Sequence, residues 1–386
     1  MEEMGKKVNG TNNTSGQGDF ASIMFWSPLQ ARMMLDDSEQ LVIFSSTWGT
    51  GKTLCLESKA IQRAQKFPDE TLTFMVMQFN SNQKTMLQME KEARFQHFSN
   101  INVIGSKNTE DISSILNKTN GIIFIDEFIL EKNMVCPLNK PAMYAKIHPN
   151  LPLIWVALAG IRDGELEDFE TKSLSNLLPM FTVAKLNMPL RTAKSVLKTA
   201  GLVGQTVQRI ANVTYGVMTN IDFTLPSHLL PGVETEHYHY SDSKNKDQVV
   251  EAVTRARLAM IHRMGNSGVP IIFTEGYGYY GIYGSDHHGS ISVGCNRARP
   301  KSPQPLIYTG ESKHNNATVI DVKEWLANFA SRKEERDIIL DIHVCRGWEV
   351  DTAIIVNMEA DYGPVSGDWF RNLVMRGIAN VILVTE

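Results

Sequence analysis

The feature that most constrains this chain is a short glycine-rich turn between an apolar run and a helical pattern. Residues 41–53 read Leu-Val-Ile-Phe-Ser-Ser-Thr-Trp-Gly-Thr-Gly-Lys-Thr, and apolar side chains recur at helical spacing over the next dozen residues. A strand, a glycine-rich loop and a helix in that order form the context of a phosphate-binding P-loop. The backbone N–H groups of residues 49–52 would line a concavity at a helix N-terminus, where the helix dipole favours an anion.

The side chains at the end of this turn suit a nucleoside triphosphate. We expect Lys52 to reach the β- and γ-phosphates and the Thr53 hydroxyl to bind Mg²⁺. The first glycine of the consensus falls on Ser46, a departure that a small residue tolerates. A glycine-rich turn that binds nothing is the alternative. The candidate nucleotide-binding residues of the loop are Ser46, Thr47, Trp48, Gly49, Thr50, Gly51, Lys52 and Thr53.

A second candidate site is an apolar strand that ends in two acids. Residues 121–127 read Gly-Ile-Ile-Phe-Ile-Asp-Glu, which after a P-loop has the form of a Walker B strand. Asp126 would hold Mg²⁺ through its water shell opposite Thr53, and Glu127 would orient and deprotonate the attacking water. Phosphoryl transfer needs mainly positioning and charge stabilisation, so these few groups suffice for a hydrolytic core. The alternative is a pair of acids that only caps a strand.

The order of apolar and amphipathic segments predicts two doubly wound α/β domains with parallel sheets. The chain has 386 residues, enough for two domains, and residues 1–20 are polar and predicted to be a disordered tail. We place the first domain at residues 21–200 and the second at 201–386. A helix is expected over residues 247–264. Strands are expected near 41–45, 72–77, 102–104, 121–125 and 153–158, and again near 269–274, 305–308, 337–341, 352–357 and 380–384.

Composition excludes several classes of protein. Hydrophobic residues make up 42% and charged residues 21% of the chain, as in globular proteins. There is no apolar run of about 18 residues, so we expect no membrane span. The N-terminal residues lack the apolar core of a secretory signal, and the four cysteines lie far apart, so we expect a reduced, intracellular location. The net charge of −4 means that any contact with nucleic acid depends on local basic patches.

Read in order, these motifs and several later ones resemble a superfamily 1 helicase motor of the UvrD/Rep kind, over roughly residues 26–385. A similar pattern occurs in schlafen-type helicase-like proteins. Residues 27–31, Ser-Pro-Leu-Gln-Ala, resemble the family's Gln motif, which implies that Gln30 hydrogen-bonds an adenine edge. Residues 74–82 lie where the family's motif Ia meets single-stranded nucleic acid. The resemblance implies two RecA-like domains with ATP and Mg²⁺ bound between them.

Three later segments resemble the motifs that complete the site from the second domain. Residues 186–194, Leu-Asn-Met-Pro-Leu-Arg-Thr-Ala-Lys, resemble motif IV and imply that Arg191 reaches the γ-phosphate. Residues 344–355 resemble motif V and imply that Glu349 approaches the ribose. Residues 372–384 resemble motif VI and imply that Arg376 is a second arginine finger. The family's motif III normally ends in an acid and a Gln, and no matching Gln follows the strand at residues 153–158.

Three functions are compatible with this pattern. The first is an ATP hydrolase that depends on single-stranded DNA or RNA and translocates or remodels it. The second is a signalling or assembly switch that uses a P-loop without helicase activity, which the missing motif III Gln favours. The third is a helicase-derived domain that binds nucleic acid without hydrolysis, against which the pair of acids argues. A further candidate nucleic-acid patch is basic, although such charge runs are most often only solvated; it comprises Arg255, Arg257 and Arg263 on one predicted helix, with Arg297, Arg299 and Lys301 in a loop.

Overall fold

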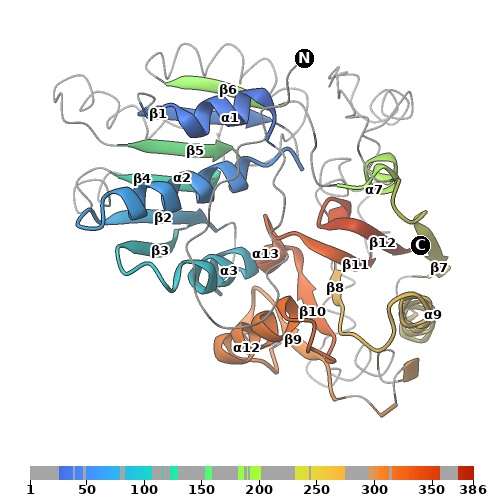
Figure 1. Cartoon of the computed structure of the whole chain (residues 1–386). Coiled ribbons are helices and arrows are strands. Elements are labelled where there is room, and N and C mark those ends of the chain that lie inside the picture. The colour runs from blue at the N-terminus through green and yellow to red at the C-terminus, as the bar shows by residue number, and fades with distance from the viewer. Residues whose placement is uncertain are drawn as a thin grey trace.

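The structure is a computed structural model in which the chain forms two parallel β-sheets with helices packed against them (Figure 1). It describes residues 26–37, 40–46, 49–78, 83–106, 115, 122–128, 153–158, 181–186, 189, 192–200, 231–242, 245–273, 295, 297–298, 300–301, 303–312, 315–356 and 373–386.

The first sheet has six parallel strands in the order β3-β2-β4-β5-β1-β6. Because β5 lies between β1 and β4, the loops that follow β1 and β4 emerge at the same edge, with one strand between them. The strands are β1 (Leu41–Ser46), β2 (Leu72–Met77), β3 (Ile101–Ser106), β4 (Ile123–Phe128), β5 (Ile154–Leu158) and β6 (Thr182–Leu186). Its helices are α1 (Pro28–Leu35), α2 (Lys52–Lys66) and α3 (Met86–Phe95).

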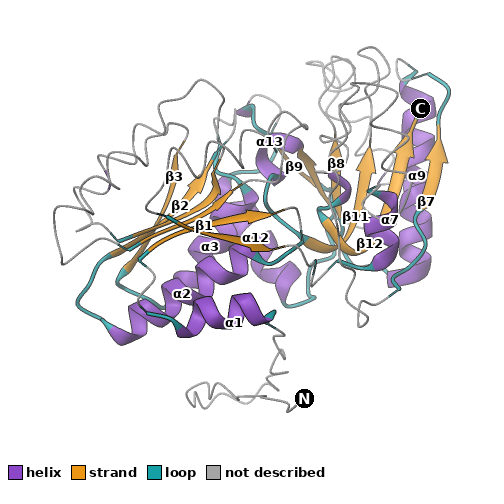
Figure 2. Cartoon of the chain, turned by 90° about the horizontal axis from the view of Figure 1, so that it is seen from above, coloured by secondary structure: helices purple, strands orange, loops and turns teal. Residues whose placement is uncertain are grey.

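The second sheet also has six parallel strands, in the order β7-β12-β11-β8-β10-β9. They are β7 (Glu236–His239), β8 (Pro270–Phe273), β9 (Leu306–Tyr308), β10 (Ile338–Asp341), β11 (Val350–Val356) and β12 (Gly377–Thr385). The helices around it are α7 (Lys194–Thr199), α9 (Lys246–Met264), α12 (Val319–Ala330) and α13 (Ile342–Cys345). Figure 2 shows the two sheets side by side, and α12 and α13 contact α3 of the first sheet.

Both sheets bury apolar side chains on both faces, which is why their strands read as nearly continuous apolar runs. In β1, Val42 and Phe44 face a cluster with α1, α2 and α3, whereas Ile43 faces a second cluster on the opposite side. In the second sheet, Ile271 and Phe273 pack with the apolar face of α9. The first cluster continues through the α12 and α13 region into the second sheet, so the two sheets share one core.

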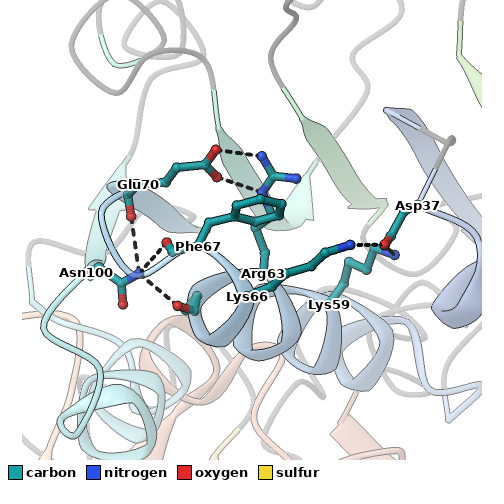
Figure 3. Close-up of polar contacts among 8 residues, drawn as sticks. Asp37, Lys59, Arg63, Lys66, Phe67, Glu70 and Asn100 are labelled. Atoms are coloured by element: carbon teal, nitrogen blue, oxygen red, sulfur yellow. Dashed lines mark hydrogen bonds and ion pairs between the residues drawn. The ribbon is translucent and has the colours of Figure 1, made fainter.

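Helix α2, whose N-terminus follows the glycine-rich loop, makes polar contacts at several points along its length (Figure 3). Asp37 accepts from Lys59 at 3.0 Å and from Lys66 at 2.7 Å, and these two bonds lower the pKa of Asp37 to about 2. Arg63 binds Glu70 through two hydrogen bonds. At the helix C-terminus, the Asn100 side chain donates to the carbonyl groups of residues 64, 67 and 70, which provides partners for backbone oxygens at the end of the helix (Figure 3).

Two of the three α9 arginines of the candidate basic patch are bound to other groups of the second domain instead of lying free in solvent. Arg257 is fully buried, and its guanidinium donates to Asp337 at 2.9 Å and to the Ser267 carbonyl at 2.8 Å. Arg263 pairs with Glu236 and donates to Asn380. Periodicity alone cannot separate an arginine that is solvated from one that is matched to a distant acid.

The expected strands and the helix at residues 247–264 are confirmed within a few residues, but β6 and β7 were not predicted. Both are edge strands with several half-buried or exposed positions, so they lack the apolar run of a central strand. His237 and His239 lie on β7. Within the described part of the chain, no helix is long and apolar enough to cross a membrane. Strands of the first sheet come from residues 41–186 and those of the second from 236–385; the division at residue 200 stays a prediction.

Candidate functional site

The glycine-rich loop has the backbone of a phosphate-binding turn. Gly49 and Gly51 have φ angles of 70° and 84°, in the left-handed region that glycine adopts at little cost. Gly51 is the N-cap of α2 and makes no side-chain hydrogen bond to the first turn of the helix. The helix begins at Lys52, which places the dipole's positive end at the loop. The side chain of Ser46 and residues 47–48 lie outside the described part of the chain.

Gln30 of α1 contacts the loop directly. Its side chain is fully buried, its amide nitrogen donates to the Thr50 carbonyl at 2.9 Å, and its oxygen accepts from the Ser27 backbone N–H at 2.8 Å. A Cβ added at Gly51 would lie 2.8 Å from the same amide nitrogen. Gln30 therefore links the start of α1 to the loop, and its contact with an adenine stays a prediction.

Asp126, the first of the two acids at the end of β4, faces the start of α2 behind the loop. The Thr53 hydroxyl donates to Asp126 Oδ1 at 3.1 Å, although the two residues are 73 positions apart in the chain. The Glu127 backbone N–H donates to the same oxygen at 3.0 Å. Asp126 is only 1% exposed, and its Oδ2 is buried without a hydrogen-bond partner among the described residues. The predicted meeting of Thr53 and Asp126 is thus present in the fold.

These features fit a divalent cation. Burial, followed by the charge of Glu127, raises the pKa of Asp126 to about 7, while the positive charge of buried Lys91 acts in the opposite direction. A hard cation prefers oxygen ligands such as a hydroxyl and a carboxylate, and it would satisfy the unpartnered Asp126 oxygen. The residues that would hold Mg²⁺ are Thr53 and Asp126. Among the described residues, no group of three or more His, Cys, Asp and Glu could hold a metal ion by itself.

The raised pKa of Asp126 predicts a pH-dependent stability. A carboxyl whose folded pKa of about 7 exceeds its ordinary value of 3.8 binds more protons in the folded than in the unfolded chain between these values. Stability from this group therefore falls as pH rises through that window. Without divalent cation, Asp126→Asn should match the wild type near about pH 4 and exceed its free energy of unfolding by about 1–3 kcal/mol near about pH 8.

Urea unfolding at several pH values measures this difference. Asp37→Asn is the matched control, because the pKa of Asp37 is lowered to about 2 and the sign reverses. That variant should lose stability near neutral pH and match the wild type only in strong acid. A gap between Asp126→Asn and the wild type that does not change with pH would contradict the prediction.

The backbone at Glu127 is unusual. Its φ of 56° lies in the left-handed region, which costs a residue with a side chain about 1–2 kcal/mol. Such conformations persist where the surrounding structure holds them, and they cluster at functional sites. The Glu127 side chain points toward the second sheet, where its Oε2 lies 3.5 Å from Nε of Arg346. A Cβ added at Gly347 would lie 2.7 Å from Glu127 Cγ.

The glycine-rich loop also has neighbours from beyond the first sheet. A Cβ added at Gly49 would lie 2.6 Å from Thr192 Oγ1 and 3.3 Å from Met375 Cε. Met375 precedes β12 of the second sheet, so the segment resembling motif VI approaches the loop. The loop and the acid pair thus both lie where the two domains meet (Figure 1).

Of the residues expected to contact the phosphates or the ribose, Arg376 and Glu349 lie in the described part of the chain and Arg191 does not. Arg376 is 3% exposed, and its Nη1 donates to the Trp348 carbonyl at 3.3 Å; its role as a finger stays a prediction. Glu349 is half-buried in the turn before β11, and its approach to a ribose also stays a prediction. Arg191 lies outside the described residues, as do residues 79–82 of the segment resembling motif Ia.

Sequence reasoning missed Arg346, whose contact with Glu127 joins positions 219 residues apart. The one signal available was its place directly before Gly347 in the segment resembling motif V. A contact between residues so far apart depends on how the two sheets pack together.

Comparison with solved structures identifies the fold. Dbp5 of S. cerevisiae, bound to RNA and ADP BeF3, has a TM-score of 0.51 and 12% identity over 93% of this chain and 83% of that chain. The DEAD-box helicase Mss116, bound to ssRNA and UDP-BeF, has a TM-score of 0.51 and 12% identity over 92% of this chain and 69% of that chain. The chain has a helicase-like fold of two RecA-like domains. No protein-family model matches the sequence, and no curated protein matches it.

Proposed function

We propose that this chain is a nucleic-acid-dependent ATPase that hydrolyses ATP with Mg²⁺ in the cleft between its two RecA-like domains. The observation that carries the proposal is the hydrogen bond from Thr53 to Asp126, beside a helix N-terminus that begins at Lys52. It unites the phosphate loop and the acid pair, the two parts that phosphoryl transfer requires.

In this mechanism the first domain binds the nucleotide and the second completes the site. Lys52 and the loop N–H groups hold the phosphates, and Thr53 and Asp126 hold Mg²⁺, which supplies charge neutralisation when bound. Glu127 orients the attacking water and accepts its proton. Arg191 and Arg376 stabilise developing charge from across the cleft, and Glu349 contacts the ribose. Gln30 holds the Thr50 carbonyl and, when nucleotide binds, contacts the adenine.

The partner proposed is single-stranded DNA or RNA. The structures of Dbp5 and Mss116 contain bound RNA, which supports this class of partner at the level of the fold. We assign the chain to the superfamily 1 kind on the residue pattern Gly347-x-Glu349 before β11 and Arg376 before β12. Closing and opening of the cleft would couple hydrolysis to a stepwise grip on the strand.

The test is ATP turnover by the purified chain, with and without single-stranded RNA and DNA of the same sequence. We expect one polymer to raise turnover about tenfold or more, in the range of typical coupling between two sites. Lys52→Ala is the control, and it should abolish the stimulated turnover. Lys52-dependent turnover that ignores both polymers would instead support a signalling or assembly switch, and ATP binding without turnover would indicate a helicase-derived domain that does not hydrolyse.

A further inference from the structure

Arg346 of the second domain is the charged side chain that the structure brings to Glu127. Its side chain is 7% exposed and that of Glu127 is 15% exposed, so the pair is largely removed from water. The two side chains form an ion pair whose Nε–Oε2 distance of 3.5 Å is longer than that of a close hydrogen bond. Catalytic contacts are often long without substrate and shorten when it binds.

The turn that carries Arg346 is held rigidly from both sides. Asp341 caps α13 by accepting from the Val344 N–H at 3.1 Å and also accepts from the Gly310 N–H at 2.8 Å. After the turn, Trp348 is 2% exposed and its ring contacts Trp325 edge-on. This framework fixes the backbone of the turn from which the Arg346 side chain extends. Side chains whose rotamers are held by surrounding packing orient a partner more precisely than mobile ones, and the Arg346 side chain is 7% exposed.

The turn also fits against Glu127 at close range. Gly347 has a φ of 74°, and a Cβ at this position would lie 2.7 Å both from Glu127 Cγ and from Leu87 Cδ2. Only glycine meets both the backbone and the steric requirement. On the facing side, Glu127 itself has a left-handed backbone, and its side chain lies against Arg346. Both partners therefore have special backbone conformations at this one contact.

We propose that Arg346 is a positioning residue that orients the Glu127 carboxylate from across the domain interface. The inference rests on the proposed function, because it takes Glu127 as the group that activates the attacking water. It adds that the base is held correctly only when the second domain is docked. A wrong orientation of a catalytic group by about 1 Å costs about 100-fold in rate. Hydrolysis would thus depend on domain closure through Arg346 as well as through the arginine fingers.

The kinetic test compares Arg346→Ala, Arg346→Gln and Arg346→Lys with the wild type at saturating nucleic acid. We expect Arg346→Ala and Arg346→Gln to lower kcat about 10- to 100-fold, with KM for ATP changed less than about twofold. Arg346→Lys should recover part of the loss, because it keeps the charge but not the planar geometry. Binding of a fluorescent ATP analogue should stay within about twofold of the wild type in all three variants.

Lys323→Ala is the matched control, because it removes another ion pair of the same interface. Lys323 Nζ lies 2.6 Å from Glu92 of α3, and Lys323 is not part of the proposed site. We expect its kcat to stay within about twofold of the wild type. An equal loss in Lys323→Ala would attribute the effect to general weakening of the interface and overturn the proposal. An unchanged or raised kcat in Arg346→Ala would overturn it too.

Two double-mutant cycles separate this proposal from the proposed function. In turnover, Arg346→Ala should cause no further loss in a Glu127→Gln background, because it acts through Glu127. In urea unfolding without nucleotide, the Arg346→Ala and Glu127→Gln shifts should be non-additive, whereas Lys323→Ala and Glu127→Gln should add. Additive shifts at Arg346 and Glu127 would overturn the positioning role. A wild type that neither binds nor hydrolyses ATP would instead overturn the proposed function.

Discussion

Glu127→Gln is expected to lower ATP turnover by about 10²–10⁴-fold, with ATP binding close to that of the wild type. Glutamine has the shape of glutamate but cannot accept the proton of the attacking water. Asp126 keeps its bond from Thr53 in this variant, so the cation site stays in place. The left-handed backbone at position 127 also remains occupied by a side chain of the same size. The measurement is kcat at saturating nucleic acid, with binding of a fluorescent ATP analogue measured separately.

Glu70→Gln is the control for this variant. Glu70 is also in the first domain and also bonded to an arginine, but it follows the C-terminal end of α2 and pairs with Arg63 in the last turn of that helix (Figure 3). We expect its turnover to stay within about twofold of the wild type, because partly exposed ion pairs contribute little. Full turnover in Glu127→Gln would contradict the assignment of Glu127 as the base.

Asp337→Ala is expected to lower the free energy of unfolding by about 3–5 kcal/mol. Asp337 is 4% exposed and accepts from Arg257 at 2.9 Å and from the Val269 backbone N–H at 3.1 Å. Alanine would leave the Arg257 guanidinium buried without its counter-charge, and an unpaired buried charge is costly. The contacts join α9 to the starts of β8 and β10, so the loss should weaken the second domain as a whole.

Urea unfolding followed by circular dichroism measures this loss. The control is Asp351→Ala, which removes an exposed acid from β11 of the same sheet and should change stability by less than about 0.5 kcal/mol. A second comparison replaces both partners, Arg257→Met with Asp337→Leu. This pair should recover much of the loss, because no lone charge remains buried. If Asp337→Ala lowered the free energy of unfolding by less than about 1 kcal/mol, the second domain would not depend on the Arg257–Asp337 ion pair for its stability.

The central strands were predictable because each carries its own signal. In β2 and β5 every position is buried, and the corresponding sequence is an almost unbroken apolar run. The edge strand β7, with Glu236 and two histidines, alternates half-buried and exposed positions and carries no such run. Its pairing with β12 depends on a partner more than 140 residues further along the chain. An edge strand of this kind forms because it pairs with β12.

The candidate site was likewise predictable only in part. The loop ending at Lys52 and Thr53 and the acid pair at Asp126 and Glu127 were predictable, because each motif is contiguous and follows a strand. Their meeting at 3.1 Å follows from strands that lie near each other in one parallel sheet. The roles of Arg191 and Arg376 remain predictions, since they depend on where a bound nucleotide lies.

The partners of individual arginines could not be predicted from the residues close to them in the sequence. On α9, helical spacing grouped Arg255, Arg257 and Arg263 as one patch, yet Arg257 lies inside the core against Asp337, 80 residues away. No neighbouring residue pattern indicated an acidic partner for Arg346, yet Arg346 lies beside Glu127, 219 residues away. A sequence pattern reports the spacing along one element. It does not report which opposite charge the packing of another element will bring.

The amino-acid sequence alone determined the local parts of this protein: a strand, a glycine-rich turn, a helix that begins at Lys52, and an apolar strand that ends in Asp126 and Glu127. Each of these arises from neighbouring residues, whose backbone preferences and apolar spacing act over a few positions. Only the tertiary structure decided that Glu127 meets Arg346 and that Gly347 must lack a side chain there. Such contacts exist because two separately wound sheets share a core, and that packing is a property of the whole chain.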